Sequence, residues 1–387
     1  MSELIQERIA LYKETVRQQS VPKRVLNHSN FYTWKYLDAG YSLKEALVDY
    51  EKLYHANMRF VERYPHDCHP DLGARNPIAV TNTLGNDLWT ITDDGMNIRD
   101  ESYMADEDYD LLIADPKKYI WEVFMPRKNK FLQQENAVEV FQNGINEYAR
   151  FAAYLKRVAK DAQEIYDVPT YFSSQAMFQS YDQGHEFLFN VLRGMKKLSV
   201  DVRRDPEKVM AAIRSIETIT IDPIFEKLYA LPGGSDPNAL ADQMLVLLSH
   251  AFLSGKQFGT FYWPFLKRIG EYAETKDKIF YVFLEASSER FWDYFKDLPK
   301  GHFLFHVEMD DIYQMRKACP NLAFAGGMPS ELLGRGKPEE CVAKTKELCE
   351  TLGADGGYMF SESKIMSYFG DAKSENLKAV CDYMQTL

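Results

Sequence analysis

The chain has 387 residues, of which 45% are hydrophobic, 27% are charged and 14% are aromatic. This composition is typical of a globular protein with a large core, and it excludes disorder as the dominant state. Acidic residues outnumber basic ones by 57 to 46, and no run of lysine or arginine occurs. The uniform attraction to phosphate that nucleic-acid binding needs is therefore missing, and we exclude DNA and RNA as partners.

The sequence also argues against a membrane partner. The longest apolar stretch, Met244 to Leu253, is interrupted by Ser249 and His250 and has about half of the ~20 residues that a membrane span needs. The N-terminal residues are polar and lack the apolar core of a signal peptide, so we expect a cytoplasmic protein. Five cysteines without a CxxC pair favour reduced thiols over disulfides.

In the first part of the chain, the spacing of the apolar residues changes once, from a helical pattern to an alternating one. Residues 1–64 are expected to be helical, and we assign them to an N-terminal helical extension. Within them, Ser42 precedes an apolar stripe with helical spacing that starts at Leu43. Residues 88–99 form two short alternating runs around Asp93-Asp94-Gly95, which is the usual pattern of a β-hairpin.

From about residue 165, short apolar runs alternate with helical stretches. Strands are expected at 279–284, 303–307, 322–325 and 357–360, with helices at 288–296, 312–318 and 338–352. Such units predict an α/β fold with a parallel sheet, either open or closed as a (β/α)8 TIM barrel. No Gly-x-Gly-x-x-Gly or Walker motif follows a strand, which argues against the open nucleotide-binding sheet. We therefore predict a barrel over residues 65–387, with the hairpin as an insertion.

Polar side chains at the carboxyl ends of the strands are the candidates for chemistry in a barrel. Because side chains alternate along a strand, His306, Glu308 and Leu304 are expected to face the interior, and Phe303, Phe305 and Val307 the helices. Three other strand ends supply polar residues, namely Glu285, Glu362 and His250.

Glu285 and His306 are separated by 20 residues, enough for one helix and two turns. We therefore expect them at equal height on neighbouring strands, where carboxylates and an imidazole would suit Zn²⁺. The alternative is that His306 forms hydrogen bonds in the core, while Glu285 and Glu308 pair with arginines or cap helices.

Two further segments are candidates for a pocket. His66-Asp67-Cys68-His69 offers three metal donors, but their spacing is too tight for all of them to reach one ion, so we expect Asp67 to serve a pocket. It would end the first βα-like turn, after Phe60-Val61. Phe261, Tyr262 and Trp263 follow the strand that ends at His250, and they would either line a flat apolar pocket or pack as an ordinary helix.

The C-terminal part resembles the uroporphyrinogen decarboxylase-like superfamily, whose members share a (β/α)8 barrel. The resemblance rests on Phe324-Ala-Gly-Gly-Met-Pro-Ser-Glu-Leu-Leu333, on Gly353-Ala-Asp-Gly-Gly-Tyr-Met359 and on Ser374-Glu-Asn-Leu-Lys-Ala-Val380, and it extends over about residues 65–387. The arginine motif with which true decarboxylases hold a polyanionic tetrapyrrole is absent from Val21 to His28. The superfamily's other large branch comprises corrinoid-dependent methyltransferases that use zinc.

Within that branch, enzymes acting on coenzyme M hold zinc with a His-x-Cys pair and a later Cys. This sequence has Glu285-Ala and Ser361-Glu362 at these places, which implies harder oxygen ligands and an oxygen substrate. The chain thus resembles the methyltransferase I component of anaerobic aryl-ether O-demethylases, which passes a methyl group to a separate corrinoid protein.

The resemblance implies a zinc ion held by Glu285, His306 and either Glu308 or Glu362, which polarises the ether oxygen of an aryl methyl ether. The ring of the substrate would lie among aromatic side chains, and a neighbouring acid would assist the departure of the phenolate by donating a proton. Phe261, Tyr262 and Trp263 are expected to hold the ring, and Asp67 or His250 is expected to be the acid. Two alternatives remain, namely a metal-free decarboxylase and a non-catalytic barrel that binds a corrinoid protein.

Overall fold

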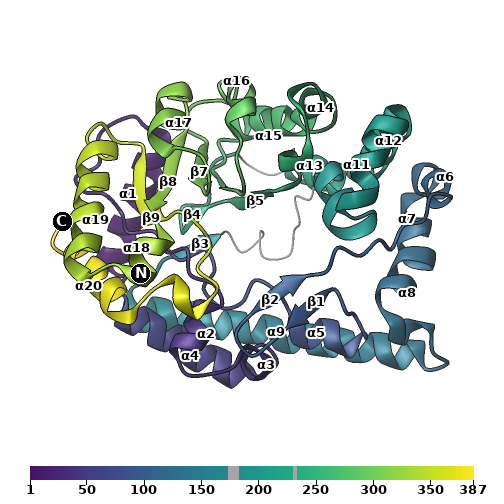
Figure 1. The fold of residues 1–387 in the computed structure, drawn as a ribbon, viewed down its shortest axis with the longest axis horizontal. Helices are drawn as coiled ribbons and strands as arrows, with labels where there is room; N and C mark the ends of the chain where they lie inside the picture. Colours follow the sequence, from purple (N-terminus) through teal and green to yellow (C-terminus); the bar gives the residue numbers. More distant parts are fainter. Residues whose placement is uncertain (173–182, 230–232) are drawn as a thin grey trace.

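A ring of parallel strands lies at the centre of the molecule, which the computed structural model describes over residues 1–172, 183–229 and 233–387 (Figure 1). Five strands pair in parallel and in chain order. They are β5 (Gln243–Leu247), β6 (Phe280–Leu284), β7 (Phe303–Val307), β8 (Ala323–Met328) and β9 (Tyr358–Glu362). Two more strands, β3 (Thr170–Phe172) and β4 (Ala239–Ala241), pair with each other in parallel, and one residue, Asp242, separates β4 from β5.

The N-terminal segment around His28 continues the ring beyond β9. Asn27 forms a parallel bridge with Phe360 of β9, and His28 forms one with Cys68. The His28 N–H donates to the Phe360 carbonyl at 2.8 Å, and the Ser29 N–H donates to the Cys68 carbonyl at 2.8 Å. The fold is thus the predicted α/β TIM barrel, but its first strand lies inside residues 1–64, the segment expected to form the helical extension.

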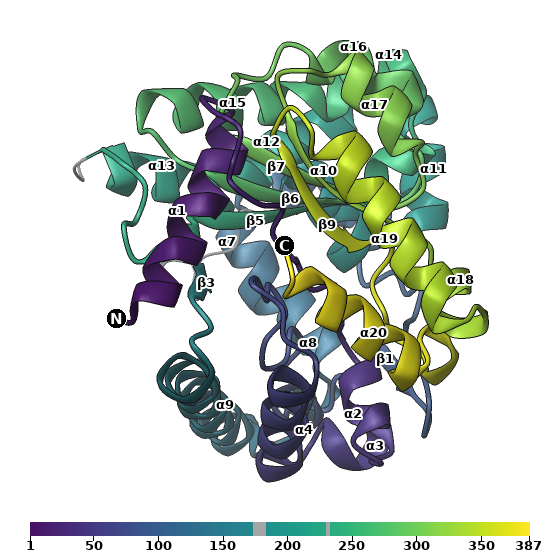
Figure 2. The same cartoon turned by 90° about the vertical axis from the view of Figure 1, so that its left-hand side faces the viewer.

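Helices surround the ring and also pack beside it (Figure 2). The N-terminal half contains α1 (Glu3–Arg17), α2 (Trp34–Asp38), α3 (Leu43–Ala46), α4 (Tyr50–Arg63), α5 (Ile78–Thr83), α6 (Asp108–Ala114), α7 (Pro116–Lys118), α8 (Met125–Lys128), α9 (Ala137–Tyr166) and α10 (Gly184–Phe187). The C-terminal half contains α11 (Met195–Arg204), α12 (Pro206–Thr220), α13 (Asp222–Tyr229), α14 (Gly255–Phe261), α15 (Trp263–Thr275), α16 (Trp292–Phe295), α17 (Ile312–Ala318), α18 (Ser330–Arg335), α19 (Pro338–Leu352) and α20 (Ser374–Met384). In the part of the chain described, no helix is both long and apolar enough to cross a membrane.

Several local predictions are confirmed. The hairpin forms as β1 (Trp89–Ile91) antiparallel to β2 (Met96–Ile98). Ser42 caps α3 as expected, but Asp49 accepts backbone hydrogen bonds and starts a second helix, α4, so the apolar stripe is divided. Phe60-Val61 lies inside α4 and not before a βα turn, because the helix continues to Arg63.

The alternation of side chains along β7 is also as predicted. Phe303, Phe305 and Val307 belong to the large apolar cluster between the strands and the outer helices. Leu304 belongs to the inner cluster, together with Tyr281 of β6. The inner and outer faces of the ring can therefore be assigned from the sequence.

Helix α1 packs against the inner cluster and joins the barrel to its N-terminus. Its residues Ile5, Ile9 and Tyr12 belong to that cluster, and the Tyr12 hydroxyl lies 2.9 Å from the Tyr171 hydroxyl of β3. Helix α1 therefore contributes to the barrel core, although it precedes all the strands.

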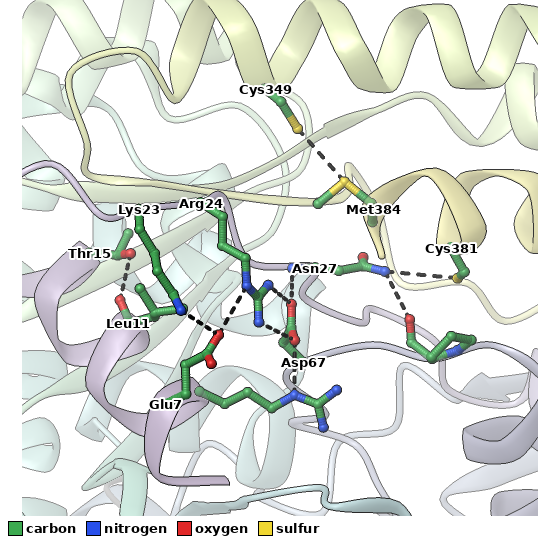
Figure 3. Close-up of polar contacts among 12 residues, drawn as sticks. Glu7, Leu11, Thr15, Lys23, Arg24, Asn27, Asp67, Cys349, Cys381 and Met384 are labelled. Atoms are coloured by element: carbon green, nitrogen blue, oxygen red, sulfur yellow. Dashed lines mark hydrogen bonds and ion pairs between the residues drawn. The ribbon is translucent and has the colours of Figure 1, made fainter. Parts of the chain in front are cut away.

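Asp67 ties α1 to the first strand (Figure 3). Its buried carboxylate accepts hydrogen bonds from Arg8 Nε at 2.9 Å, from Arg24 Nη1 and Nη2 at 2.8 and 3.0 Å, and from the Asn27 N–H at 2.9 Å. Burial acts to raise the pKa of Asp67, but the hydrogen bonds and charges of Arg24 and Arg8 outweigh it and lower the pKa. These four bonds occupy both carboxylate oxygens and assign Asp67 a structural role.

We predict that Asp67→Asn lowers the free energy of unfolding at pH 7 by about 3–5 kcal/mol, because it leaves the buried Arg8 guanidinium without its counter-charge and the half-buried Arg24 with Glu7 alone. Since folding lowers the pKa of Asp67, its contribution is present in full above about pH 5 and is lost as the pH falls below that. Denaturant unfolding of the wild type and the variant, at pH 7 and at a pH below about 5, measures the difference between their free energies of unfolding.

Glu350→Gln is the matched control, because Glu350 is 66% exposed and pairs with Lys346 across one helical turn. This variant is expected to change the free energy of unfolding by less than about 1 kcal/mol. An equal effect of the two substitutions at pH 7 would contradict the role assigned to Asp67.

Candidate functional site

The pairing of β6 with β7 determines which predicted residues meet at the mouth of the barrel. Phe283 pairs with His306, and Leu284 pairs with Val307. Continued by one residue, this register places Glu285 beside Glu308. The expectation that Glu285 and His306 lie at equal height is therefore wrong, because His306 lies two residues deeper, or about 7 Å at ~3.3 Å per residue.

Glu285 and Glu308 are joined through a strained backbone. Ala286, directly after Glu285, has φ of +59°, a left-handed conformation that is rare for alanine. The Ala286 N–H donates to Glu308 Oε2 at 3.0 Å, and the Glu285 N–H donates to the Leu247 carbonyl at 3.0 Å. Such strain persists only where surrounding contacts hold it, and it is concentrated at functional sites.

Glu285 is surrounded by negative charge. Burial and the Glu308 carboxylate raise its pKa to about 7, Glu186 acts in the same direction, and Arg75 opposes them. A substantial fraction of Glu285 is therefore a neutral carboxylic acid at neutral pH, able to donate a proton.

Glu186 of α10 is the third carboxyl group at this mouth. Its Oε1 accepts the Tyr262 hydroxyl at 2.5 Å and the Leu248 and Ser249 N–H groups, each at 2.9 Å. Burial raises the pKa of Glu186 despite these donors. Tyr262, predicted to line the pocket, is thus held beside the carboxyl cluster by a hydrogen bond.

The other two predicted aromatic residues lie elsewhere in the packing. Phe261 belongs to the apolar cluster formed largely by α6, α11 and α12. Trp263 packs on Tyr294, with ring centroids 5.4 Å apart. Neither the apolar cluster nor the Tyr294 contact places these two side chains beside Glu285.

His250 and His185 are buried next to Tyr262. Their rings make edge contacts with the Tyr262 ring at 6.2 and 5.9 Å, and His185 Nδ1 lies 2.7 Å from Ser249 Oγ. Burial lowers the pKa of His250 to about 4, so it is an uncharged imidazole at neutral pH. Among the residues that the structure describes, neither ring nitrogen of His250 has a hydrogen-bond partner.

His306 is engaged in the barrel core. Its Nδ1 lies 2.8 Å from the Tyr281 hydroxyl, and its Nε2 lies 2.6 Å from the Glu362 carbonyl oxygen and 3.1 Å from Asn30 Nδ2. Burial lowers the pKa of His306 to about 4. This is the arrangement of the alternative prediction, in which His306 forms hydrogen bonds in the core.

The Glu362 carboxylate lies on the other face of its strand. Glu362 alternates with Ser361 and shares its side with Phe360, which packs towards the helices. Its Oε2 accepts the Asn30 N–H at 3.0 Å, and burial raises its pKa to about 7. Only the backbone carbonyl of Glu362, and not its carboxylate, reaches His306.

A cavity of about 250 Å³ includes in its lining Arg75, whose charge acts on Glu285. Its lining includes Tyr171, Phe172 and Met244 together with the ion pair of Arg75 and Asp71. Arg75 Nε and Nη2 donate to the two oxygens of Asp71 at 2.8 and 2.6 Å. The guanidinium lies 5.9 Å from the Phe283 ring, which connects the cavity to the end of β6.

The inner face of β5 is less buried than the inner faces of β6 and β7. Met244 is half-buried and Val246 is 37% exposed, whereas the β6 and β7 residues Tyr281, Phe283 and Leu304 are fully buried. Met244 also lines the cavity, so a planar apolar ligand in the cavity would contact β5.

Comparison with known proteins agrees with this architecture. Residues 188–387, just over half of the chain, match the family described as uroporphyrinogen decarboxylase (URO-D). The chain belongs to this family. A methyltransferase from Methanosarcina mazei has a similar fold, with a TM-score of 0.61 over 98% of each chain and 12% identity. No protein of curated function matches the chain.

The predicted ligands do not fit a zinc ion in this URO-D family member as they are arranged. Both ring nitrogens of His306 have partners, and the Glu362 carboxylate faces away from it. Over residues 1–172, 183–229 and 233–387, no three His, Cys, Asp or Glu side chains lie close enough together to hold a metal. What the mouth offers instead is a group of carboxyl groups and the nearby guanidinium of Arg75.

Several residues of the site could not be predicted from the sequence, because none of them directly follows a strand that the sequence reveals. Arg75 and Asp71 follow a segment whose barrel strand was not recognised, so they were not placed at a strand end. Glu186 lies on α10, where no strand precedes it directly. Asn30 follows the His28 strand, which was assigned to the helical extension.

We predict that Glu308→Gln lowers the pKa of Glu285 below about 7, since it removes the neighbouring negative charge and retains an oxygen that accepts the Ala286 N–H. The pH titration of ¹³C-labelled glutamate carboxyl groups, assigned by the loss of one signal in Glu285→Gln, measures this. Glu289→Gln is the control, because Glu289 is exposed in the same loop. An unchanged pKa in Glu308→Gln would contradict the charge coupling.

Proposed function

We propose that this protein is a methyltransferase that takes the methyl group of an aryl methyl ether and passes it to the cobalt(I) of a separate corrinoid protein. Membership of the URO-D family, the fold shared with a solved methyltransferase and the oxygen-rich strand ends support the proposal. The single observation that carries it is the meeting of Glu285, Glu308 and Glu186 at the barrel mouth, near Arg75, which also lines a cavity with Tyr171, Phe172 and Met244.

The cavity and the carboxyl cluster suit the cleavage of an ether. The arene would lie against Met244 and Val246 of β5, with aromatic side chains at the cavity wall. When bound, the partner's corrinoid supplies the electron pair that forms the new bond to the methyl carbon. As the bond between that carbon and the ether oxygen breaks, its electron pair stays on the oxygen, and Glu285 delivers a proton there, so that a neutral phenol leaves.

The neighbouring carboxyl groups prepare Glu285 for this step. A phenolate is a costly leaving group in an apolar site, and protonation removes that charge. Burial and the Glu308 and Glu186 carboxyl groups raise the pKa of Glu285, and Glu308 also accepts a hydrogen bond from the Ala286 N–H. Arg75 can donate a hydrogen bond to an anionic ring substituent at the cavity, since its described hydrogen bonds to Asp71 use Nε and Nη2 and leave Nη1 for another acceptor.

The proposal is tested by mixing the purified protein with reduced corrinoid protein and one methyl donor at a time. The donors are a methoxyphenol, a methoxybenzoate, methanol, methylamine and a methylated thiol, and the methylated corrinoid is followed by its absorbance. Transfer from the methoxyarenes alone is expected. A preference for a non-aromatic donor, or the release of CO₂ from a carboxylated substrate without methyl transfer, would overturn the proposal.

Glu285→Gln is predicted to lower the turnover number by about 100-fold or more, with a smaller change in KM, because it removes the proton donor and preserves the size of the side chain. Glu289→Gln, in the same loop, should retain the wild-type rate. Thermal unfolding confirms that both variants are folded. Wild-type turnover by Glu285→Gln would contradict the role of this carboxyl group.

Zinc at this mouth is a proposal that rests on the resemblance alone. A zinc ion bound by His306 would have to replace one of its described partners, such as the Tyr281 hydroxyl. Elemental analysis of protein purified without chelators tests it: about one zinc per chain, lost sharply in His306→Ala, would support the resemblance, whereas the arrangement of the described side chains predicts that none is bound to His306. Full methyl transfer in the presence of a strong chelator, with no zinc detected, would contradict the zinc site that the resemblance implies.

A further inference from the structure

The cavity that Arg75 lines has the size and the walls of a site for a small aromatic ligand. Its volume of about 250 Å³ lies just below the ~300–1,000 Å³ of sites for drug-sized ligands, so it suits a molecule with one ring. The walls come from residues 69–75, α9, β3 and β5, and they are largely apolar. The apolar lining includes Leu155, Tyr171, Phe172 and Met244.

Two groups of the lining have hydrogen-bonding capacity to spare. Arg75 uses Nε and Nη2 for the two oxygens of Asp71, so its Nη1 can donate to a further acceptor. His69 is only 5% exposed, and among the described residues its Nε2 has no hydrogen-bond partner. A ligand with hydrogen-bond acceptors would satisfy both groups.

The charges behind this lining are not balanced. Lys35 is buried, and its Nζ donates to the Asp71 carbonyl at 2.6 Å and to Asn57 Oδ1 at 2.8 Å, which are both neutral oxygens. The Asp71 carboxylate itself is bound by Arg75. Burial lowers the pKa of Lys35 to about 7, although the charge of Asp71 opposes this. A buried cation without a paired anion is costly, so the cavity favours a ligand that brings negative charge.

We propose that this cavity binds an aromatic carboxylate, whose ring packs against Tyr171, Phe172 and Met244. The carboxylate accepts hydrogen bonds from Arg75 Nη1 and from the His69 ring, and bonds of this charge-assisted kind are about twice as strong as neutral ones. As an identification of the methyl donor, the inference rests on the proposed function and selects methoxybenzoates over methoxyphenols. As a binding site, it stands without that function.

Calorimetric titration of the protein alone, without corrinoid protein, tests the site with benzoate and with benzamide. The two ligands have nearly the same shape, but only benzoate is charged. Benzoate is expected to bind at one site per chain and at least about 10-fold more tightly than benzamide. Equal affinity for the two ligands, or no binding of benzoate, would overturn the proposal.

Substitutions of the two donors test where the carboxylate binds. Arg75→Gln is expected to weaken benzoate binding by about 30-fold or more, and benzamide binding by less than about threefold. His69→Phe keeps a ring of similar shape and removes the nitrogen atoms, so it should weaken benzoate binding by about 5-fold or more. Unchanged benzoate affinity in both variants would contradict the assigned donors.

A substitution on α9 tests the cavity without disturbing the Arg75–Asp71 ion pair. Ala159 lines the cavity from an exposed position, so Ala159→Trp should fill the space and weaken benzoate binding by about 30-fold or more. Lys160→Trp, at the next exposed position and outside the lining, is the matched control and should change the affinity by less than about threefold. Circular dichroism confirms that each variant is folded. Wild-type benzoate affinity in Ala159→Trp would overturn the proposal.

The same ligands separate this inference from the proposed function. Methyl transfer from a methoxyphenol by a protein that does not bind benzoate would overturn the carboxylate site and leave the methyltransferase proposal intact. Benzoate binding that depends on Arg75, in a protein that transfers no methyl group from any methoxyarene, would do the reverse.

Discussion

The parallel hydrogen bonding of β6 to β7 determines the chemistry that the barrel mouth can perform. By pairing Phe283 with His306, it places Glu285 level with Glu308 and leaves the imidazole one inward-facing position deeper. Two carboxyl groups in a partly dry site cannot both ionise easily, so the pKa of Glu285 rises. A shift of the pairing by one residue would turn one of these side chains towards the helices and separate the pair.

The same register explains why the imidazole and the carboxylates serve different purposes. His306 is completed by Tyr281, Asn30 and the Glu362 carbonyl, so it fixes the interior of the barrel. Among the residues that the structure describes, Glu285 has no such set of donors, and it lies at the end of β6 near Arg75. The left-handed Ala286 and its bond to Glu308 hold this border in place, which is where strain is useful in a catalytic site.

The sequence predicted the fold well and the site only in part. Alternation along β7 and the helices at 312–318 and 338–352 follow from local patterns, and the structure reproduces them. The height of Glu285 relative to His306 depends on the register between strands, which the number of intervening residues does not determine. The strand at His28 is too short and too polar to be recognised alone, since its partners Cys68 and Phe360 are distant in the sequence. With it, Asn30, Arg75 and Asp71 were lost from the predicted site.

The central claim is that the substrate's ether oxygen meets the Glu285 carboxyl group at the level of Glu308. The most direct measurement is an experimental structure of the protein with a methoxyarene bound in the absence of the corrinoid protein. The account predicts that the ring lies against Met244 and Val246, with its ether oxygen within about 3 Å of a Glu285 carboxyl oxygen. An ether oxygen held next to His306, or a ring bound outside the barrel, would contradict it.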